Sequence, residues 1–207
     1  MPEEHDKTEQ NQPDEYYVQA LLLAEVVKRI LDRKGDVKLS DMPILELKPI
    51  TEFVKRMRAT SVGKFEGKAY IATINFYRDQ KSLEMNQVVG TLILYLPEEQ
   101  TVWLLQKLEY PDVDEDDEAV LKDACGAFCN LIAGNFKNGL TQLGYEDLIM
   151  SHFTSYVNDV FEGVLYPLER TDLYEIAFKI REQKSMVFEL VMGDVPKAYE
   201  LNLSYFK

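Results

Sequence analysis

Hydrophobic residues recur at every third or fourth position in two long stretches of the chain. The first stretch extends from Tyr16 to Lys34 and stops at Gly35, and the second extends over residues 116–140 toward the Gly139–Gly144 region. A spacing of three and four places apolar side chains on one face of an α-helix. The pattern therefore predicts two long amphipathic helices.

Alternation with a period of two marks four other segments as β-strands. Two of them, Tyr70–Phe76 and Val88–Leu96, are separated by a polar loop. Two more, Tyr174–Ile180 and Met186–Leu190, are joined at Glu182–Lys184. We expect these segments to form two antiparallel hairpins.

The remaining segments give weaker signals. Pro97 and the two glutamates after it favour a short helix that runs to about Leu108. Pro43 and Pro49 break any regular element before a strand near Phe53–Val62. Because helices alternate with hairpins rather than with single strands, we expect an α+β fold, an antiparallel β-sheet built from hairpins with long helices packed on it.

The beginning of the chain differs in composition from the rest. Residues 1–14 are polar and acidic, with two prolines and no apolar periodicity, so we expect a disordered tail there. The 207-residue chain is 46% hydrophobic and 29% charged, which is ordinary for a globular protein. Residues 15–207 are therefore expected to form a single domain.

The net charge of −13 disfavours nucleic acid or anionic lipid as a partner. No apolar run reaches the roughly 20 residues of a membrane helix, and the first residues lack the apolar stretch of a secretory signal. We therefore expect a cytoplasmic protein without membrane insertion. A local basic stretch between Lys48 and Lys68 either neutralises an acidic partner or forms a solvated strand face.

The two cysteines, Cys125 and Cys129, lie four residues apart on the second long helix. This spacing does not favour a disulfide, so we interpret them as small core residues of a reduced protein. His5 and His152 are the only histidines and do not complete a zinc set with them. We expect no metal or cofactor of the protein's own.

The second long helix has two contrasting faces. Its predicted core face consists of apolar side chains: Val120, Leu121, Ala124, Phe128, Leu131 and Ile132. The opposite side carries a polar and small stripe spaced four, three, four and three: Asp123, Ala127, Asn130, Gly134 and Lys137. We expect this stripe to face solvent or a partner.

Glycines inside this helix also require a reason. Gly126 and Gly134 each cost about 1 kcal/mol relative to alanine in a helix interior. Close approach of another backbone would explain them. On one interpretation, another helix of the same chain or a second subunit packs there, and Asn130 is only a surface amide.

The segment from Asp123 to Lys137 reads Asp-Ala-Cys-Gly-Ala-Phe-Cys-Asn-Leu-Ile-Ala-Gly-Asn-Phe-Lys. It resembles the motif helix of the CheC/CheX/FliY chemotaxis phosphatases, most of all in its CheX-like form. That helix carries Glu-x-x-Asn and a tail of small residues. Asn130 matches the asparagine, whereas Ala127 stands in place of the glutamate. The resemblance covers most of residues 67–145, including the run Gly90–Gln100, and less specifically the C-terminal hairpin.

The resemblance implies a function in chemotaxis or two-component signalling. The partner would be a phosphorylated CheY-type receiver domain, and the activity would be hydrolysis of its aspartyl phosphate. Asn130 would be the catalytic residue that positions the attacking water, with Asp123, Ala127, Gly134 and Lys137 contacting the partner. The receiver would supply Mg²⁺. In the family the glutamate pairs with a receiver lysine, so the site of this chain is degenerate at Ala127.

Asp123 offers two interpretations. It lies one turn before Ala127 on the same stripe and could reach a lysine of the partner from there. Alternatively, it only complements the positive end of the helix together with Asp116, Asp117 and Glu118.

Three functional hypotheses follow. The first is a CheX-like protein that binds phosphorylated receivers and has weak or absent phosphatase activity. The second is a non-catalytic receiver-binding or scaffold module of the same fold. The third is a fold that serves self-association, because exposed hairpin edges can pair across a two-fold axis into a homodimer.

Overall fold

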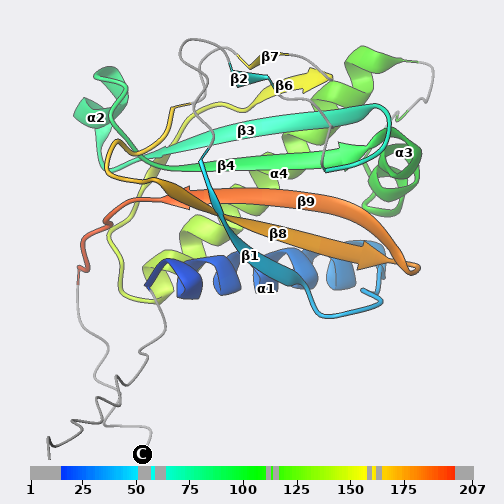
Figure 1. The fold of residues 1–207 in the computed structure, drawn as a ribbon, viewed down its shortest axis with the longest axis horizontal. Helices are drawn as coiled ribbons and strands as arrows, with labels where there is room; N and C mark the ends of the chain where they lie inside the picture. The colour runs from blue at the N-terminus through cyan, green and yellow to red at the C-terminus, as the bar shows by residue number, and fades with distance from the viewer. Residues whose placement is uncertain are drawn as a thin grey trace, which may run out of the picture.

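The computed structural model describes residues 15–50, 57–58, 64–110, 113, 117–157, 160–161 and 165–198 (Figure 1). The tail expected over residues 1–14 lies outside this set, as does most of the strand expected near Phe53–Val62. Only a two-residue strand, β2 (Met57–Arg58), is described there, and it pairs with β7 (Val160–Phe161).

One antiparallel sheet organises the molecule. Its seven strands follow the order β1-β8-β9-β4-β3-β5, and β6 also pairs with β3. The strand bounds are β1 Ile44–Pro49, β3 Ala69–Tyr77, β4 Val88–Pro97, β5 Ile149–Met150, β6 Thr154–Val157, β8 Asp172–Ile180 and β9 Gln183–Met192. The α+β class and the sheet built from hairpins are confirmed.

The two predicted hairpins are β3–β4 and β8–β9. The second is tighter than its sequence indicated, because Lys184 already lies in β9 and the turn consists of Arg181 and Glu182, with φ of 53° and 65°. Both turn residues adopt the left-handed conformation that two-residue hairpin turns require. The polar loop of the first hairpin contains a short helix, α2 (Gln80–Glu84), whose first turn is capped by the Asp79 carboxylate.

The expectation that Pro43 and Pro49 break any regular element was wrong. Strand β1 begins directly after Pro43, ends at Pro49 and pairs with β8 at an outer edge of the sheet. Proline is tolerated at the first residue or on an edge strand, where its missing N–H removes no ladder bond. Strands β5 and β6 were also not predicted, because each is too short to show alternation.

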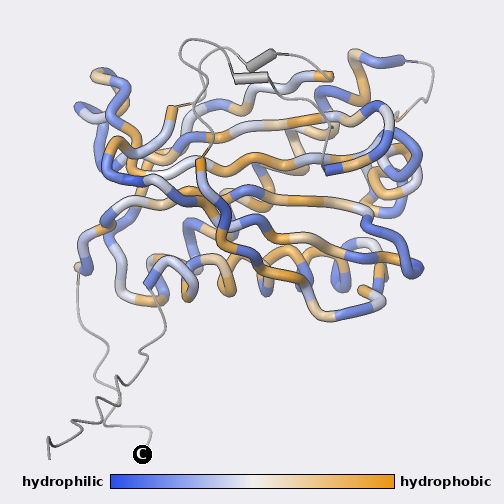
Figure 2. Tube along the Cα trace, in the orientation of Figure 1, coloured by the Kyte–Doolittle hydropathy of each residue, from blue (hydrophilic) through white to orange (hydrophobic). Residues whose placement is uncertain are grey.

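In the described residues, three longer helices accompany the sheet: α1 (Glu15–Gly35), α3 (Glu98–Lys107) and α4 (Glu118–Gln142). Figure 1 shows α1 and α4 on the same face, behind the strands. Their apolar sides and the sheet form the main core, in which the Phe76 and Phe136 rings meet edge to face at 5.8 Å. Figure 2 shows the corresponding alternation of hydrophobic and hydrophilic positions along these helices.

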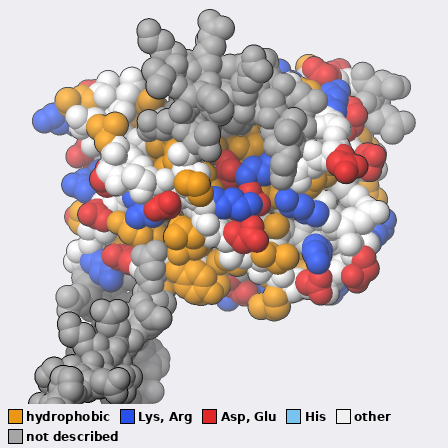
Figure 3. Space-filling view, viewed as in Figure 1, with side chains coloured by type: hydrophobic (Ala, Val, Ile, Leu, Met, Phe, Trp, Pro, Cys, Tyr) orange, Lys and Arg blue, Asp and Glu red, His pale blue; other side chains and the backbone are white. Residues whose placement is uncertain are grey.

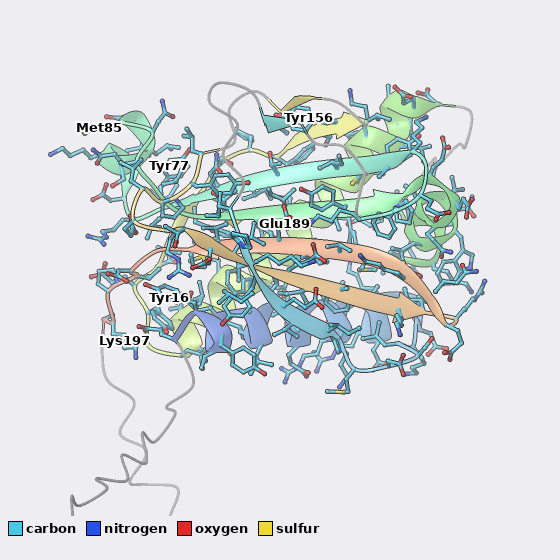
Figure 4. The ribbon with its side chains drawn as sticks, in the orientation of Figure 1. Tyr16, Tyr77, Met85, Tyr156, Glu189 and Lys197 are labelled. Carbon is cyan, nitrogen blue, oxygen red and sulfur yellow. The ribbon has the colours of Figure 1, made fainter. Side chains whose placement is uncertain are left out.

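The other face of the sheet contains a charged cluster, defined here as Lys48, Lys64, Glu175 and Glu189. The two glutamates are cross-strand neighbours and only 4% and 7% exposed. The Lys64 ammonium donates to both carboxylates, and the Lys48 ammonium lies 2.7 Å from Glu175 Oε1. Figure 3 shows acidic and basic side chains gathered at the centre of this face, and Figure 4 places Glu189 there.

Candidate functional site on the outer face of α4

Helix α4 begins where the sequence indicated. The Asp117 carboxylate accepts hydrogen bonds from the backbone N–H groups of Ala119 and Val120 at 3.0 and 3.2 Å. Such a side-chain cap satisfies donors that have no partner within the helix. Asp117 thus sets the start of the helix. The position of the stripe Asp123, Ala127, Asn130, Gly134 and Lys137, called the α4 stripe from here on, follows from that start.

The α4 stripe faces away from the sheet. The side chains turned to the sheet are buried: Leu121, Ala124, Cys125, Phe128, Cys129, Ile132, Ala133, Phe136 and Leu140. On the opposite side Asp123 and Asn130 are exposed, and Ala127, Gly134 and Lys137 are half-buried. Of the predicted core face, Val120 and Leu131 are only half-buried, because they flank the centre of the buried side.

The polar members of the stripe differ in their partners. Within the described part of the chain, the side chains of Asp123 and Asn130 form no hydrogen bond or ion pair. The Lys137 ammonium lies 2.9 Å from the Asp147 carboxylate. An exposed carboxamide and an exposed carboxylate therefore remain available, whereas the positive charge of Lys137 is compensated within the chain.

The position of Asp123 bears on its two interpretations. Helix α4 starts at Glu118, so Asp123 lies beyond the first turn. The favourable effect of an acidic residue on the helix dipole falls off within that first turn. The helix-end interpretation is weakened as a result, and Asp123 remains a candidate for contact with a partner.

The two helix glycines have different surroundings. A Cβ atom at Gly126 would lie 2.1 Å from Phe153 Cδ2 and 2.6 Å from Ser155 Oγ, so close packing exists there, but side chains provide it rather than the expected backbone. A Cβ atom at Gly134 would have no heavy atom of another segment within 4 Å. Gly126 is thus explained by packing inside the chain. Gly134 leaves the surface beside Asn130 low and open.

The described residues of this region support neither a reactive cysteine nor a metal site. Cys125 and Cys129 are fully buried and free, as predicted, and burial raises the pKa of both thiols, which disfavours a reactive thiolate. Among the residues that the structure describes, no three His, Cys, Asp or Glu side chains come together as a metal site would require.

The basic stretch is compensated within the chain, as far as its side chains are described. Lys48 and Lys64 belong to the charged cluster. Lys68 lies 2.9 Å from carboxylate oxygens of both Glu98 and Glu118. These three lysines are therefore engaged with acidic residues of the same chain.

A groove beside the stripe was not visible in the sequence. A groove of about 520 Å³ that is open to solvent lies between helices α1 and α4. The α4 wall includes Leu131 and Asn135, which directly follow Asn130 and Gly134 in the chain. The groove and the stripe are therefore adjacent surfaces of the same helix.

Solved structures with a similar fold come from chemotaxis proteins. Chemotaxis protein CheX from Vibrio vulnificus has a TM-score of 0.57 at 13% identity, covering 84% of this chain and 98% of that one. A CheC-like superfamily protein from Shewanella sp. PV-4 has a TM-score of 0.57 at 16% identity, with 85% and 97% covered. FliY from Thermotoga maritima has a TM-score of 0.50 at 11% identity, with 83% and 84% covered.

No protein-family model matches the sequence, and neither does any curated protein. The structural similarity nevertheless extends over most of both chains, so this protein has the CheC/CheX-like fold. The resemblance found in the motif helix is confirmed at the level of the fold. In the described part of the chain, no helix combines the length and apolar character needed to cross a lipid bilayer.

Proposed function

We propose that this chain is a CheX-like signalling protein of the cytoplasm that binds phosphorylated CheY-type receiver domains through the α4 stripe. The observation that carries the proposal is the setting of Asn130. Its carboxamide is exposed at the middle of α4 without a partner in the described chain, between Ala127 and the open Gly134. A surface of small residues around one exposed amide suits insertion of a helix into a partner's active site.

The chemistry requires little of the protein. Water attacks the phosphorus of the aspartyl phosphate and the bond from phosphorus to the aspartate oxygen breaks. The aspartate carboxylate of the receiver is regenerated, and inorganic phosphate leaves with the oxygen of the water, while the protons of that water go to phosphate and solvent. An acyl phosphate is already activated, so holding one water in line supplies much of what the reaction needs. The Asn130 carboxamide can accept a hydrogen bond from that water and so orient it, while Mg²⁺ belongs to the receiver.

Ala127 limits the activity. It cannot form the ion pair that a glutamate would make with a receiver lysine, and loss of a desolvated interfacial pair costs about 2–5 kcal/mol. Docking through the stripe alone should be weak. Asp123, one turn or about 6 Å along the helix axis, is the carboxylate nearest in register that could replace it.

The alternative function is a receiver-binding scaffold of the same fold without catalysis. The alanine at position 127 favours it, because the Glu-x-x-Asn pair of the resembled phosphatases is incomplete in this chain. The two functions differ in one quantity, the rate of phosphate loss from a bound receiver. Both predict that the receiver contacts the outer face of α4.

We also propose that the protein forms a homodimer. The hairpin edges that were expected to be exposed are paired in the described sheet, β8 with β1 and β3 with β5 and β6. Strand β1 is instead an outer strand of that sheet, and Ile44 and Leu47 on it are exposed together with Met42 before it. An open edge strand with exposed apolar side chains favours pairing with another chain. Sedimentation equilibrium should give twice the chain mass, and a monomer at working concentration would contradict this proposal.

A phosphate-release assay tests the proposed function. Receiver domains from the same genome are phosphorylated, and release of inorganic phosphate is followed with and without the full chain. We expect at least one receiver to lose phosphate faster with the chain present, and Asn130→Ala to remove that acceleration. Acceleration that survives Asn130→Ala would show that another group orients the water. Binding without acceleration would favour the scaffold function.

A further inference from the structure

The groove between α1 and α4 has an unusual charge. Its α1 wall includes three cationic side chains, Arg29, Arg33 and Lys34, and no carboxylate lines it from either helix. The whole chain has a net charge of −13, so this wall is a local reversal of sign. A surface of this kind favours contact with an acidic segment of a partner.

The three cations are not equally available. Arg29 Nε lies 2.8 Å from Glu25 Oε1, an ion pair within α1. Arg33 and Lys34 are exposed and form no ion pair within the described part of the chain. The neighbouring carboxylate of Asp32 is engaged by Lys38. Arg33 therefore presents an unpaired guanidinium, which can bind a carboxylate through two parallel hydrogen bonds.

The rest of the groove fits a peptide segment. Its apolar lining includes half-buried Leu22, Val26 and Leu131, which can receive apolar side chains. On the α4 wall, Asn135 and Asn138 provide amide donors and acceptors. The Asn135 amide also donates to the Leu131 carbonyl oxygen at 2.8 Å, which holds that side chain over α4.

We infer that an acidic segment of the receiver lies in this groove and that Arg33 anchors it. This inference rests on the proposed function, because it concerns the same partner while it contacts Asn130. The charge that this chain contributes to docking would then be positive rather than negative. It lacks a glutamate at Ala127 but offers the Arg33 guanidinium in the adjacent groove. The groove supplies affinity that the stripe has lost.

The test measures affinity between the full chain and receiver domains of the same genome loaded with beryllofluoride and Mg²⁺. Arg33→Glu should weaken binding by about tenfold or more, because it places like charges at the contact. The matched control is Lys28→Glu, which makes the same charge change on α1 outside the groove and should change affinity by less than about twofold. Raising the salt concentration should narrow the gap between the wild-type chain and Arg33→Glu.

Other outcomes separate the inference from the proposed function. A bulky substitution in the stripe, Gly134→Trp, should abolish receiver binding. If it does so while Arg33→Glu binds as tightly as the wild-type chain, the groove inference is wrong and the proposed function stands. If no receiver binds the wild-type chain, both are wrong. If Arg33→Glu changes only the sedimentation of the chain, the groove binds a second copy, which also overturns the inference.

Discussion

Polar side chains gather in two regions of this molecule, the outer face of α4 and the opposite face of the sheet. On the sheet face Glu175 and Glu189 are buried and engaged by Lys64. On α4 the side chains of Asp123 and Asn130 are exposed and form no interaction within the described part of the chain. The polar groups on the sheet face are thus engaged within the chain, whereas those on α4 are available for contact with a partner.

The charged cluster has an internal explanation. Like charges directly opposite each other across two strands repel, so Glu175 and Glu189 need compensation. Burial acts to raise the pKa of Glu175, but hydrogen bonds from Lys48 and Lys64 outweigh it and hold that pKa below its usual value. The Tyr95 hydroxyl donates to Glu189 at 2.7 Å. The cluster therefore needs no ligand to account for it.

The largest expected effect is on the charged cluster. Lys64→Met leaves two buried carboxylates facing each other, and breaking a buried pair by removing one partner costs about 3–5 kcal/mol of unfolding free energy. Denaturant unfolding measures this loss. The control is Lys68→Met, whose ion pairs are with half-exposed Glu98 and Glu118 and are worth about 1 kcal/mol or less. Equal losses in the two variants would contradict the comparison.

The two glycines of α4 provide the next test. Gly126→Ala places a methyl group against Phe153 and Ser155, and such overpacking costs about 1–3 kcal/mol. Gly134→Ala meets open space and should stabilise the protein by up to about 1 kcal/mol through helix propensity. Thermal or denaturant unfolding of the two variants measures the free energy of unfolding, which should fall in Gly126→Ala and rise in Gly134→Ala.

The Gly134→Ala variant also tests whether a partner contacts the outer side of α4. Gly134→Ala should stabilise the free protein and yet weaken receiver binding, if a partner approaches the helix closely at this point. A destabilised Gly134→Ala variant would show that the described packing does not account for this surface. An unchanged receiver affinity would place the contact elsewhere on the stripe.

Much of this architecture was predictable because it depends on local periodicity. The spacing of apolar residues identified α1 and α4, and alternation identified β3, β4, β8 and β9. Strand β1 was missed because its flanking prolines are signals of interruption, and only pairing with β8 shows that they bound an edge strand. The strands β5 and β6 have too few residues to show a pattern.

The candidate site likewise has one part that local sequence pattern predicts and one part that it does not. The α4 stripe follows from helical spacing within one segment, so its exposed face could be predicted. The groove forms only because α1 and α4 pack side by side. Its two walls could not be connected from the sequence, since Arg33 and Asn135 lie about one hundred residues apart. The pairing of Lys64 with Glu175 and Glu189 likewise depends on strand order. Contacts of this kind are set by tertiary packing rather than by pattern.

The central claim is the proposal that Asn130 orients the attacking water and that docking is weak because residue 127 is alanine rather than glutamate. The most direct measurement is phosphate release from receivers of the same genome with Ala127→Glu, beside Ala127→Gln as a neutral control of similar size. We predict that Ala127→Glu accelerates release by about tenfold or more over the wild-type chain, that Ala127→Gln does not, and that adding Asn130→Ala removes the gain. If Ala127→Glu accelerates release from no receiver, the claim is contradicted.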